Sequence, residues 1–427
     1  MTKIRISSRR SDLARLQAYQ VGKALMQANG DLEVEYFFKE SLGDKNLNDP
    51  LWKMPERGVF TEDFVSDLLE ERTDLVVHSW KDLPTEPRAN LEIAATLPRA
   101  DARDLLLLRK NCLGKETLEL LTSSPRRAFA SGAVLAPLLP FKVKEIRTKP
   151  VRGNIFTRLK KLSDGEGDGL FLAKAALDRL LTTNGFPEDF SEARAEIREL
   201  LKEFCWMVLP LSLFPSAPAQ GALAIEIRSD RKDLKKLLAS IHHEETSECV
   251  QEERRRFSAF GGGCHQKIGI TVQKHPRLGR VEFFHGQPDG QDPSRTITVC
   301  PVPARPEGSI WPEGSRPVFQ RKILSDIRNP GGNLFISRAN ALPENWSISA
   351  EQLVWAAGVH TWKKLAQRGI WVNGCCDGLG ESVPETRALC ENENGWTKLT
   401  HEGDRKSTRL NSSHGYILVC RLLLEKK

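Results

Sequence analysis

The stretch FGGGCHQKIG, residues 260–269, places one cysteine on a glycine loop between a helix and a strand. Residues 243–257 before it form a charged helical run, and residues 267–272 after it have the pattern of a strand. Three consecutive glycines can adopt positive φ and let a bulky group approach the backbone closely. The thiol of Cys264 would then be exposed and able to carry a covalent adduct. The alternative is a tight turn beside a buried, inert cysteine.

The composition is typical of a soluble globular protein with several domains. A chain of 427 residues is too long for one core, so we expect about three domains. Apolar residues make up 40% and charged residues 28% of the chain, the usual balance for such a protein. The net charge of +7 indicates an anionic partner, without distinguishing nucleic acid, phosphate and carboxylate.

The sequence lacks the patterns of an exported or membrane protein. Residues 1–6 run directly into an alternating strand pattern, without the apolar core of a signal peptide. No run of about 18 apolar residues occurs, so we expect no membrane span. The nine cysteines include no CxxC pair, which indicates reduced thiols in the cytoplasm and neither a disulfide framework nor a zinc site.

The N-terminal strand and helix enclose a polar turn. Residues 3–7 are typical of a strand and residues 11–28 of a helix. The sequence SSRRS at 7–11 therefore lies where unpaired N–H groups and the helix dipole attract an anion. The alternative is a helix cap with a solvated arginine pair.

A second polar stretch follows a short buried strand at residues 74–77. The sequence HSWKDLPT at 78–85 comes directly after it. Ligands of open α/β sheets gather at the carboxyl ends of strands. Lys81 would bind an anion there and Asp82 would act as a general acid or base; the alternative is a local ion pair at a turn.

Arginines recur in loops that would follow further strands. They occur in TSSPRR at 122–127, in RGN at 152–154, and at Arg158 and Arg179. Guanidinium groups match planar carboxylates and phosphates, so several such loops indicate one large polyanionic ligand. A nucleic-acid surface is the competing interpretation, but aromatic residues make up only 7% of the chain and single-strand binding needs them as stacking platforms.

The remaining periodicity predicts an α/β pattern followed by a smaller α+β part. Further strands are expected at residues 33–38, 104–109, 169–173, 209–213, 222–227, 280–285 and 296–302. Further helices are expected at residues 60–70, 155–162, 175–181, 186–205, 233–243 and 245–260. The pair His242 and His243 lacks metal-ligand spacing with Cys249, so we interpret it as one face of a helix and expect no metal site.

Seven of these stretches together resemble the hydroxymethylbilane synthase (porphobilinogen deaminase) family. Each motif alone is weak, but they occur in the family's order over about residues 1–300. The stretches are SSRRSDLARLQA at 7–18, HSWKDLPTE at 78–86, TSSPRR at 122–127, VRGNIFTRLKKL at 151–162, LAKAALDRL at 172–180, PAQGALAIEIR at 218–228 and FGGGCHQKIG at 260–269.

The resemblance implies two doubly wound α/β domains of the type II periplasmic-binding-protein kind, facing each other across a cleft. A small α+β domain would carry the cysteine loop. The implied boundaries are residues 1–98 with 207–228 for the first domain, 99–206 for the second and 229–308 for the third.

The resemblance also implies the reaction and its residues. A dipyrromethane cofactor would be bound to Cys264 through a thioether, and four porphobilinogen units would be added in turn with loss of ammonia before water releases hydroxymethylbilane. Asp82 would assist the loss of ammonia. The cofactor and growing chain would be held by Lys81, Ser124, Arg126, Arg127, Arg152 and Arg158, and the substrate by Arg9, Ser11, Gln17, Arg179 and Phe60.

Three departures from the family pattern affect the fine geometry. Arg57 replaces the usual lysine of a mobile loop over the site, and Pro125 replaces an apolar residue. An extra pair of residues lies around Lys149 and Pro150, just before Arg152.

The C-terminal part lies outside that family. Residues 309–332 are expected to form a linker, and residues 333–403 resemble a piece of uroporphyrinogen-III synthase, with a degenerate extension as the alternative. The piece is too short for that enzyme's two lobes, so we expect no second activity. Residues 404–427 begin with a stretch that resembles a translated sequencing adapter, and we set them aside.

Two other classes of function compete with the enzyme. A two-lobed anion sensor would use the same fold but would need neither Lys81–Asp82 nor Cys264. A basic RNA-binding protein would show salt-dependent affinity and no pyrrole adduct. We expect an enzyme that acts as a monomer on a small-molecule substrate, without a nucleic-acid or membrane partner.

Overall fold

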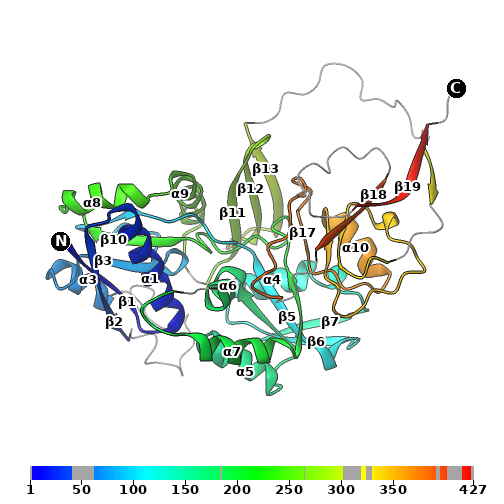
Figure 1. The fold of residues 1–427 in the computed structure, drawn as a ribbon, viewed down its shortest axis with the longest axis horizontal. Coiled ribbons are helices and arrows are strands. Elements are labelled where there is room, and N and C mark those ends of the chain that lie inside the picture. Colours follow the sequence, from blue (N-terminus) through cyan, green and yellow to red (C-terminus); the bar gives the residue numbers. More distant parts are fainter. Residues whose placement is uncertain are drawn as a thin grey trace.

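The computed structural model describes residues 2–40, 62–182, 185–263, 265–301, 319–323, 329–390, 395–401 and 416–424. Figure 1 shows three β-sheets with helices packed beside them, and a further unit near the C-terminus. Among the described residues, no helix combines the length and apolar character needed to cross a bilayer.

The first sheet has the strand order β2-β1-β3-β10-β4. Strand β1 pairs in parallel with β2 and β3, whereas β10 is antiparallel to both β3 and β4. Helices α1 and α8 share one apolar cluster with the sheet, and α3 packs in a separate cluster that includes Val76. The elements are β1 (Thr2–Arg9), α1 (Asp12–Ala28), β2 (Leu32–Lys39), α3 (Glu62–Leu69), β3 (Leu75–Ser79), β4 (Leu91–Ala95), β10 (Leu223–Arg228) and α8 (Lys232–Leu238).

The second sheet repeats this plan with the order β7-β6-β8-β5-β9. Strand β5 is antiparallel to β8 and β9, while β6 is parallel to β7 and β8. The four consecutive leucines of β5 are buried on both faces of the sheet. Leu106 and Leu108 lie in an apolar cluster with α4, and Leu105 and Leu107 lie in a second apolar cluster with α5, α6 and α7. The elements are β5 (Asp104–Arg109), β6 (Thr117–Leu121), α4 (Pro125–Val134), β7 (Glu145–Lys149), α5 (Ile155–Ser163), β8 (Gly169–Ala173), α6 (Lys174–Thr182), α7 (Ser191–Leu201) and β9 (Phe204–Val208).

In each sheet the antiparallel strand comes directly after the chain crosses from one sheet to the other. Residues 96–103 connect β4 to β5, and residues 209–222 connect β9 to β10. Together with helices on both faces, this topology makes both units doubly wound domains of the type II periplasmic-binding-protein kind. The predicted fold class is therefore confirmed, while the domain boundaries stay a prediction.

A third, antiparallel sheet follows, and helix α9 packs against its first strand. A further sheet near the C-terminus has the order β14-β19-β18-β15-β16-β17, with β18, β15, β16 and β17 in parallel. The elements are α9 (Glu244–Ser258), β11 (Lys267–His275), β12 (Gly279–Gln287), β13 (Ser294–Cys300), β14 (Phe319–Ile323), β15 (Asn333–Ile336), β16 (Val354–Ala356), α10 (Val359–Gln367), β17 (Gly374–Cys375), β18 (Trp396–His401) and β19 (Tyr416–Leu424). Short 3-10 helices are η2 (Trp80–Asp82), η3 (Lys110–Cys112), η4 (Ala136–Leu138), η5 (Ala239–Ile241) and η6 (Ala339–Ala341).

Two predicted elements between the second and first domains are wrong. The helix expected at 186–205 covers only Ser191–Leu201, and the apolar residues after it form β9 beside β5. Residues 209–213 form a turn instead of a strand, because Pro210 cannot donate a ladder hydrogen bond and its carbonyl accepts from the N–H of Phe214.

One buried carboxylate connects the crossings to the third domain. Glu253 of α9 is fully buried and binds Arg99 in the first crossing through two contacts of 2.6 and 3.0 Å. Its oxygens also accept from the backbone N–H of Ala219 in the second crossing and of Val272 in β11, both at 2.7 Å. Glu253 therefore fixes α9 and β11 to both crossings.

We predict that Glu253→Gln lowers the free energy of unfolding by about 3–5 kcal/mol, because it leaves Arg99 buried without its charged partner. The urea midpoint of the purified chain measures this. Glu248→Gln, on the same helix, is the control: its ion pair with Lys274 is solvent-exposed, so the change is expected to stay below about 1 kcal/mol. Equal effects of the two substitutions would contradict a connecting role for Glu253.

Candidate functional site

Lys81 and Asp82 lie in η2, directly at the carboxyl end of β3. The turn is anchored by the buried Trp80, whose backbone N–H donates to the carbonyl of Ala222 at 3.1 Å. Gln17 of α1 is buried and hydrogen bonds to the hydroxyl of Ser79 at 3.0 Å. Because the turn is held on both sides, the side chains of Lys81 and Asp82 occupy the edge of the first sheet.

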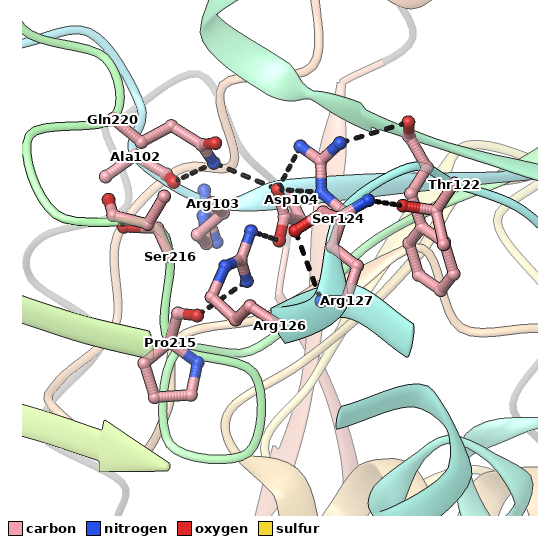
Figure 2. Close-up of polar contacts among 12 residues, drawn as sticks. Ala102, Arg103, Asp104, Thr122, Ser124, Arg126, Arg127, Pro215, Ser216 and Gln220 are labelled. Carbon is pink, nitrogen blue, oxygen red and sulfur yellow. Dashed lines mark hydrogen bonds and ion pairs between the residues drawn. The ribbon is translucent and has the colours of Figure 1, made fainter. Parts of the chain in front are cut away.

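Asp104, the first residue of β5, gathers two arginines of the TSSPRR motif (Figure 2). It is fully buried, and its two oxygens lie 2.8 Å from Nη2 of Arg126 and 2.7 Å from Nη2 of Arg127. Burial opposes ionisation of Asp104, but the two guanidinium groups hold its pKa well below its usual range. Ser124 caps α4 by accepting from the N–H of Arg127.

Gln220 links this arginine pair to Lys81. Its amide nitrogen donates to Asp104 at 2.9 Å and to the carbonyl of Ala102 at 2.7 Å (Figure 2), and its amide oxygen accepts from Lys81 at 3.4 Å. Burial lowers the pKa of Lys81 to about 8; the charges of Arg127 and Arg126 act in the same direction, while Asp82 and Asp104 oppose them. The two domains therefore meet at a crowded group of cations.

Two more arginines complete this group. Arg158 donates to the carbonyl of Gly153 at 2.8 Å, and burial, followed by the charges of Arg127 and Arg152, lowers its pKa to about 10. Arg179 of α6 donates to the carbonyl of Gly221 at 2.8 Å, and burial lowers its pKa to about 10.

The cations outnumber the carboxylates that face them. Asp104 balances Arg126 and Arg127 together, and the lowered pKa values of Lys81 and Arg158 mean that protein groups do not fully compensate their charge. Nε of Arg126 is buried without a hydrogen-bond partner in the described part of the chain. Since guanidinium and ammonium groups pair with carboxylates, the arrangement fits a ligand that carries several of them.

The glycine loop lies beside the residues that follow Asp82. Gly261, Gly262 and Gly263 all have positive φ, between 63° and 95°, as expected from the sequence. A Cβ on Gly262 would lie 2.8 Å from the hydroxyl of Thr85, so only glycine allows this close approach. The loop that carries Cys264 thus runs past the Lys81–Asp82 turn.

The structure places some predicted site residues and leaves others outside the described range. Arg9 ends β1 and Ser11 precedes α1, in the turn expected to bind an anion, and the charge of Arg9 also acts on Arg158. Phe60, Arg57 and Cys264 lie outside the described residues. Among the described residues, no cluster of three or more potential metal ligands occurs.

Sequence reasoning missed two members of the group. Asp104 was assigned only to a strand, although an aspartate opening the run DLLLLR is an unusual charge for a strand buried on both faces. Gln220 lay in the motif PAQGALAIEIR, which was recognised without a role for this residue. Nothing in the local pattern of PAQG indicates that its amide spans Asp104 and Lys81.

Comparison with known proteins identifies relatives of most of the chain. Residues 4–236 match the family model described as "Porphobilinogen deaminase, dipyromethane cofactor binding domain". Porphobilinogen deaminase of Syntrophomonas wolfei is 31% identical over 309 residues, 72% of this chain and 92% of the relative. The Chromobacterium violaceum enzyme of that name is 32% identical over 312 residues, 73% of this chain and 87% of the relative.

Similarity to solved structures is weak by comparison. YhfZ from Shigella flexneri superposes with a TM-score of 0.29 and 14% identity, over 61% of this chain and 97% of that chain. The effector binding domain of a BenM variant gives 0.28 and 14%, over the same shares. The fold assignment above therefore rests on the strand orders.

We predict that polycarboxylate binding to the Cys264→Ala protein weakens as the pH rises from 7 to 9. Lys81 has a lowered pKa, so it loses its proton, and with it its attraction for anions, as the pH passes about 8. Calorimetric titration with benzenehexacarboxylate measures the affinity. Lys81→Gln should bind more weakly at pH 7 and lose most of the pH dependence, whereas Lys160→Gln, an exposed residue of α5, should behave like the parent. The same pH profile in both variants would exclude Lys81 as its source.

Proposed function

The chain belongs to the porphobilinogen deaminase family, and on this basis we propose a role for each of its site residues. It is a transferase of tetrapyrrole biosynthesis, which joins four porphobilinogen molecules to a dipyrromethane primer with loss of ammonia and releases hydroxymethylbilane by hydrolysis.

The buried cations are suited to the dipyrromethane cofactor that the matched domain binds. Each pyrrole carries an acetate and a propionate, so the primer and the growing chain bring many carboxylates. We assign these carboxylates to Lys81, Ser124, Arg126, Arg127, Arg152 and Arg158, and the thioether to Cys264. The bound cofactor would supply the free pyrrole carbon to which the first unit is joined, and each later unit would be joined to the terminal pyrrole of the growing chain.

Asp82 has the position and charge for the chemical step. It is exposed, and the charge of its carboxylate acts on both Lys81 and Arg158. In each addition the C–N bond of the aminomethyl group breaks, ammonia leaves and a C–C bond forms. Asp82 would accept a hydrogen bond from the pyrrole N–H, stabilise the positive charge and receive the proton released when the C–C bond forms.

The incoming substrate would bind where the first sheet faces the cation group. Arg9 ends β1, Ser11 precedes α1, and Gln17 lies about one and a half helical turns further along α1. Arg179 approaches from α6 of the second domain. We assign the two carboxylates of porphobilinogen to these polar and charged residues, and we assign Phe60 to the substrate site as an apolar contact.

The observation that carries this proposal is the surplus of buried positive charge beside Asp82. A ligand sensor would need an anion site but no exposed carboxylate such as Asp82 beside it. Nucleic acid fits poorly, because Arg126, Arg127 and Arg179 are at most 8% exposed and cannot reach the backbone of a strand on the surface. We further propose a cytoplasmic monomer without a membrane partner.

The C-terminal part contains a small parallel sheet. Its parallel strands β15, β16 and β17, with α10 between the last two, form a βαβ arrangement. The strand after α10 lies at Gly374–Cys375, directly after Asn373, whose amide donates to the carbonyl of Trp206 in β9. The relation to uroporphyrinogen-III synthase stays a prediction, and we propose no second activity.

We predict that Cys264→Ala gives a soluble protein without a cofactor, because the substitution removes the sulfur that forms the thioether. Intact mass and an aldehyde colour test for pyrroles measure this: the parent should carry the mass of two pyrrole units and the variant none. Cys249→Ala, which removes a buried thiol on α9, is the control and should keep the adduct. An adduct on the Cys264→Ala protein would refute the assigned attachment.

We predict that Asp82→Asn retains the cofactor and loses turnover by about 10²–10⁴-fold, because the amide has neither the charge nor the proton affinity of the carboxylate. Formation of hydroxymethylbilane from porphobilinogen is the assay, with intact mass to confirm the adduct. The exposed Asp164→Asn, at the end of α5, should keep normal turnover. Normal turnover of the Asp82→Asn holoenzyme would rule out the proposed mechanism.

A further inference from the structure

Residues 374–379 of the C-terminal part contact both crossings between the first two domains. The carbonyl of Cys375 accepts a hydrogen bond of 3.2 Å from Arg103, at the end of the first crossing. Asp377 accepts from the backbone N–H groups of Leu211 at 3.1 Å and Ser212 at 3.0 Å, in the second crossing. The hydroxyl of Ser212 donates to the same carboxylate.

The same six residues also reach the third domain. His275, at the end of β11, hydrogen bonds through Nε2 to the carbonyl of Leu379 at 2.6 Å. The side chain of Leu379 packs in a small apolar cluster with Leu211 of the second crossing and with Val281 of β12. These residues therefore connect the two crossings to each other and to the third domain.

Asp377 has a conformation that supports a specific role. It lies at φ 54°, in the left-handed region that non-glycine residues rarely adopt. Such strain persists where surrounding contacts hold the residue in place. Here the contacts are three hydrogen bonds from the crossing to one carboxylate.

The crossing held by Asp377 also holds the anion site. Four residues after Leu211, the carbonyl of Pro215 accepts from Arg126 at 2.8 Å (Figure 2). The same guanidinium lies over the ring of Phe214, with its central carbon 5.8 Å from the ring centroid. A change in the crossing at residues 211–212 therefore alters the support of Arg126.

We propose that residues 374–379 restrain movement at the hinge between the first two domains. This restraint would favour short enzyme-bound chains over long ones. The inference rests on the proposed function. A growing chain needs more room between the domains, and hinge segments absorb such movements. Contacts that stabilise the present arrangement of the crossings raise the relative free energy of displaced arrangements. The contacts of residues 374–379 thereby oppose the later additions of porphobilinogen more than the first.

Hydrogen exchange of the holoenzyme tests, without turnover, whether residues 374–379 restrain the second crossing. Asp377→Gly removes the carboxylate and suits the positive φ, so the amides of residues 211–212 should exchange about tenfold faster. Asp377→Asn keeps one acceptor oxygen and should give a smaller increase. Lys364→Gln is the control: this exposed residue of α10 lies in the same C-terminal part, and its substitution should leave this exchange unchanged. Unchanged exchange in Asp377→Gly would overturn the proposal.

A limiting dose of porphobilinogen then tests the consequence. Intact mass should show that Asp377→Gly shifts the enzyme-bound chains toward the longer intermediates, at least twofold relative to the parent and to Lys364→Gln. An unshifted distribution, despite faster exchange, would also overturn the proposal while the family activity stands. A parent holoenzyme that adds no porphobilinogen would instead refute the proposed function.

Discussion

The ionised carboxylate of Asp104 is the interaction on which the anion site depends. Two buried guanidinium groups, an amide and the start of β5 meet at this one residue. Without it Arg126 and Arg127 would face each other unpaired, and removal of one partner from such a buried pair costs about 3–5 kcal/mol. Because Asp104 directly follows the first crossing, the site and the interdomain connection form together.

The sequence predicted the parts of the fold in which local pattern and tertiary structure agree. The run DLLLLR and the motif LVVHS are strands because their apolar residues are buried on both sides of a sheet. Residues 209–213 are mostly apolar too, but Pro210 interrupts the strand, and the backbone of Leu211 and Ser212 bonds to Asp377, more than 160 residues away, a contact that no local pattern contains. The same reason explains why Lys81 and the arginines were recognised by residue type, while the acceptors that fix them were not.

The C-terminal part is built into the body of the protein. Leu334, Ile336 and Trp362 lie in the same apolar cluster as Leu120 and Leu138 of the second domain. The indole of Trp371 and the amide of Asn373 both donate to the carbonyl of Trp206 in β9. A packed cluster and hydrogen bonds at an edge strand cover surface that the second domain would otherwise expose.

The late position of β10 in the chain has a consequence for biosynthesis. The first sheet is completed only by β10, which follows the entire second domain in the chain. On the ribosome, β3 and β4 must therefore wait with unpaired edges until the second domain has emerged. The domain that is synthesised first is finished last, so an early stop or a slow stretch of translation before residue 223 exposes two strand edges of a nascent chain to aggregation.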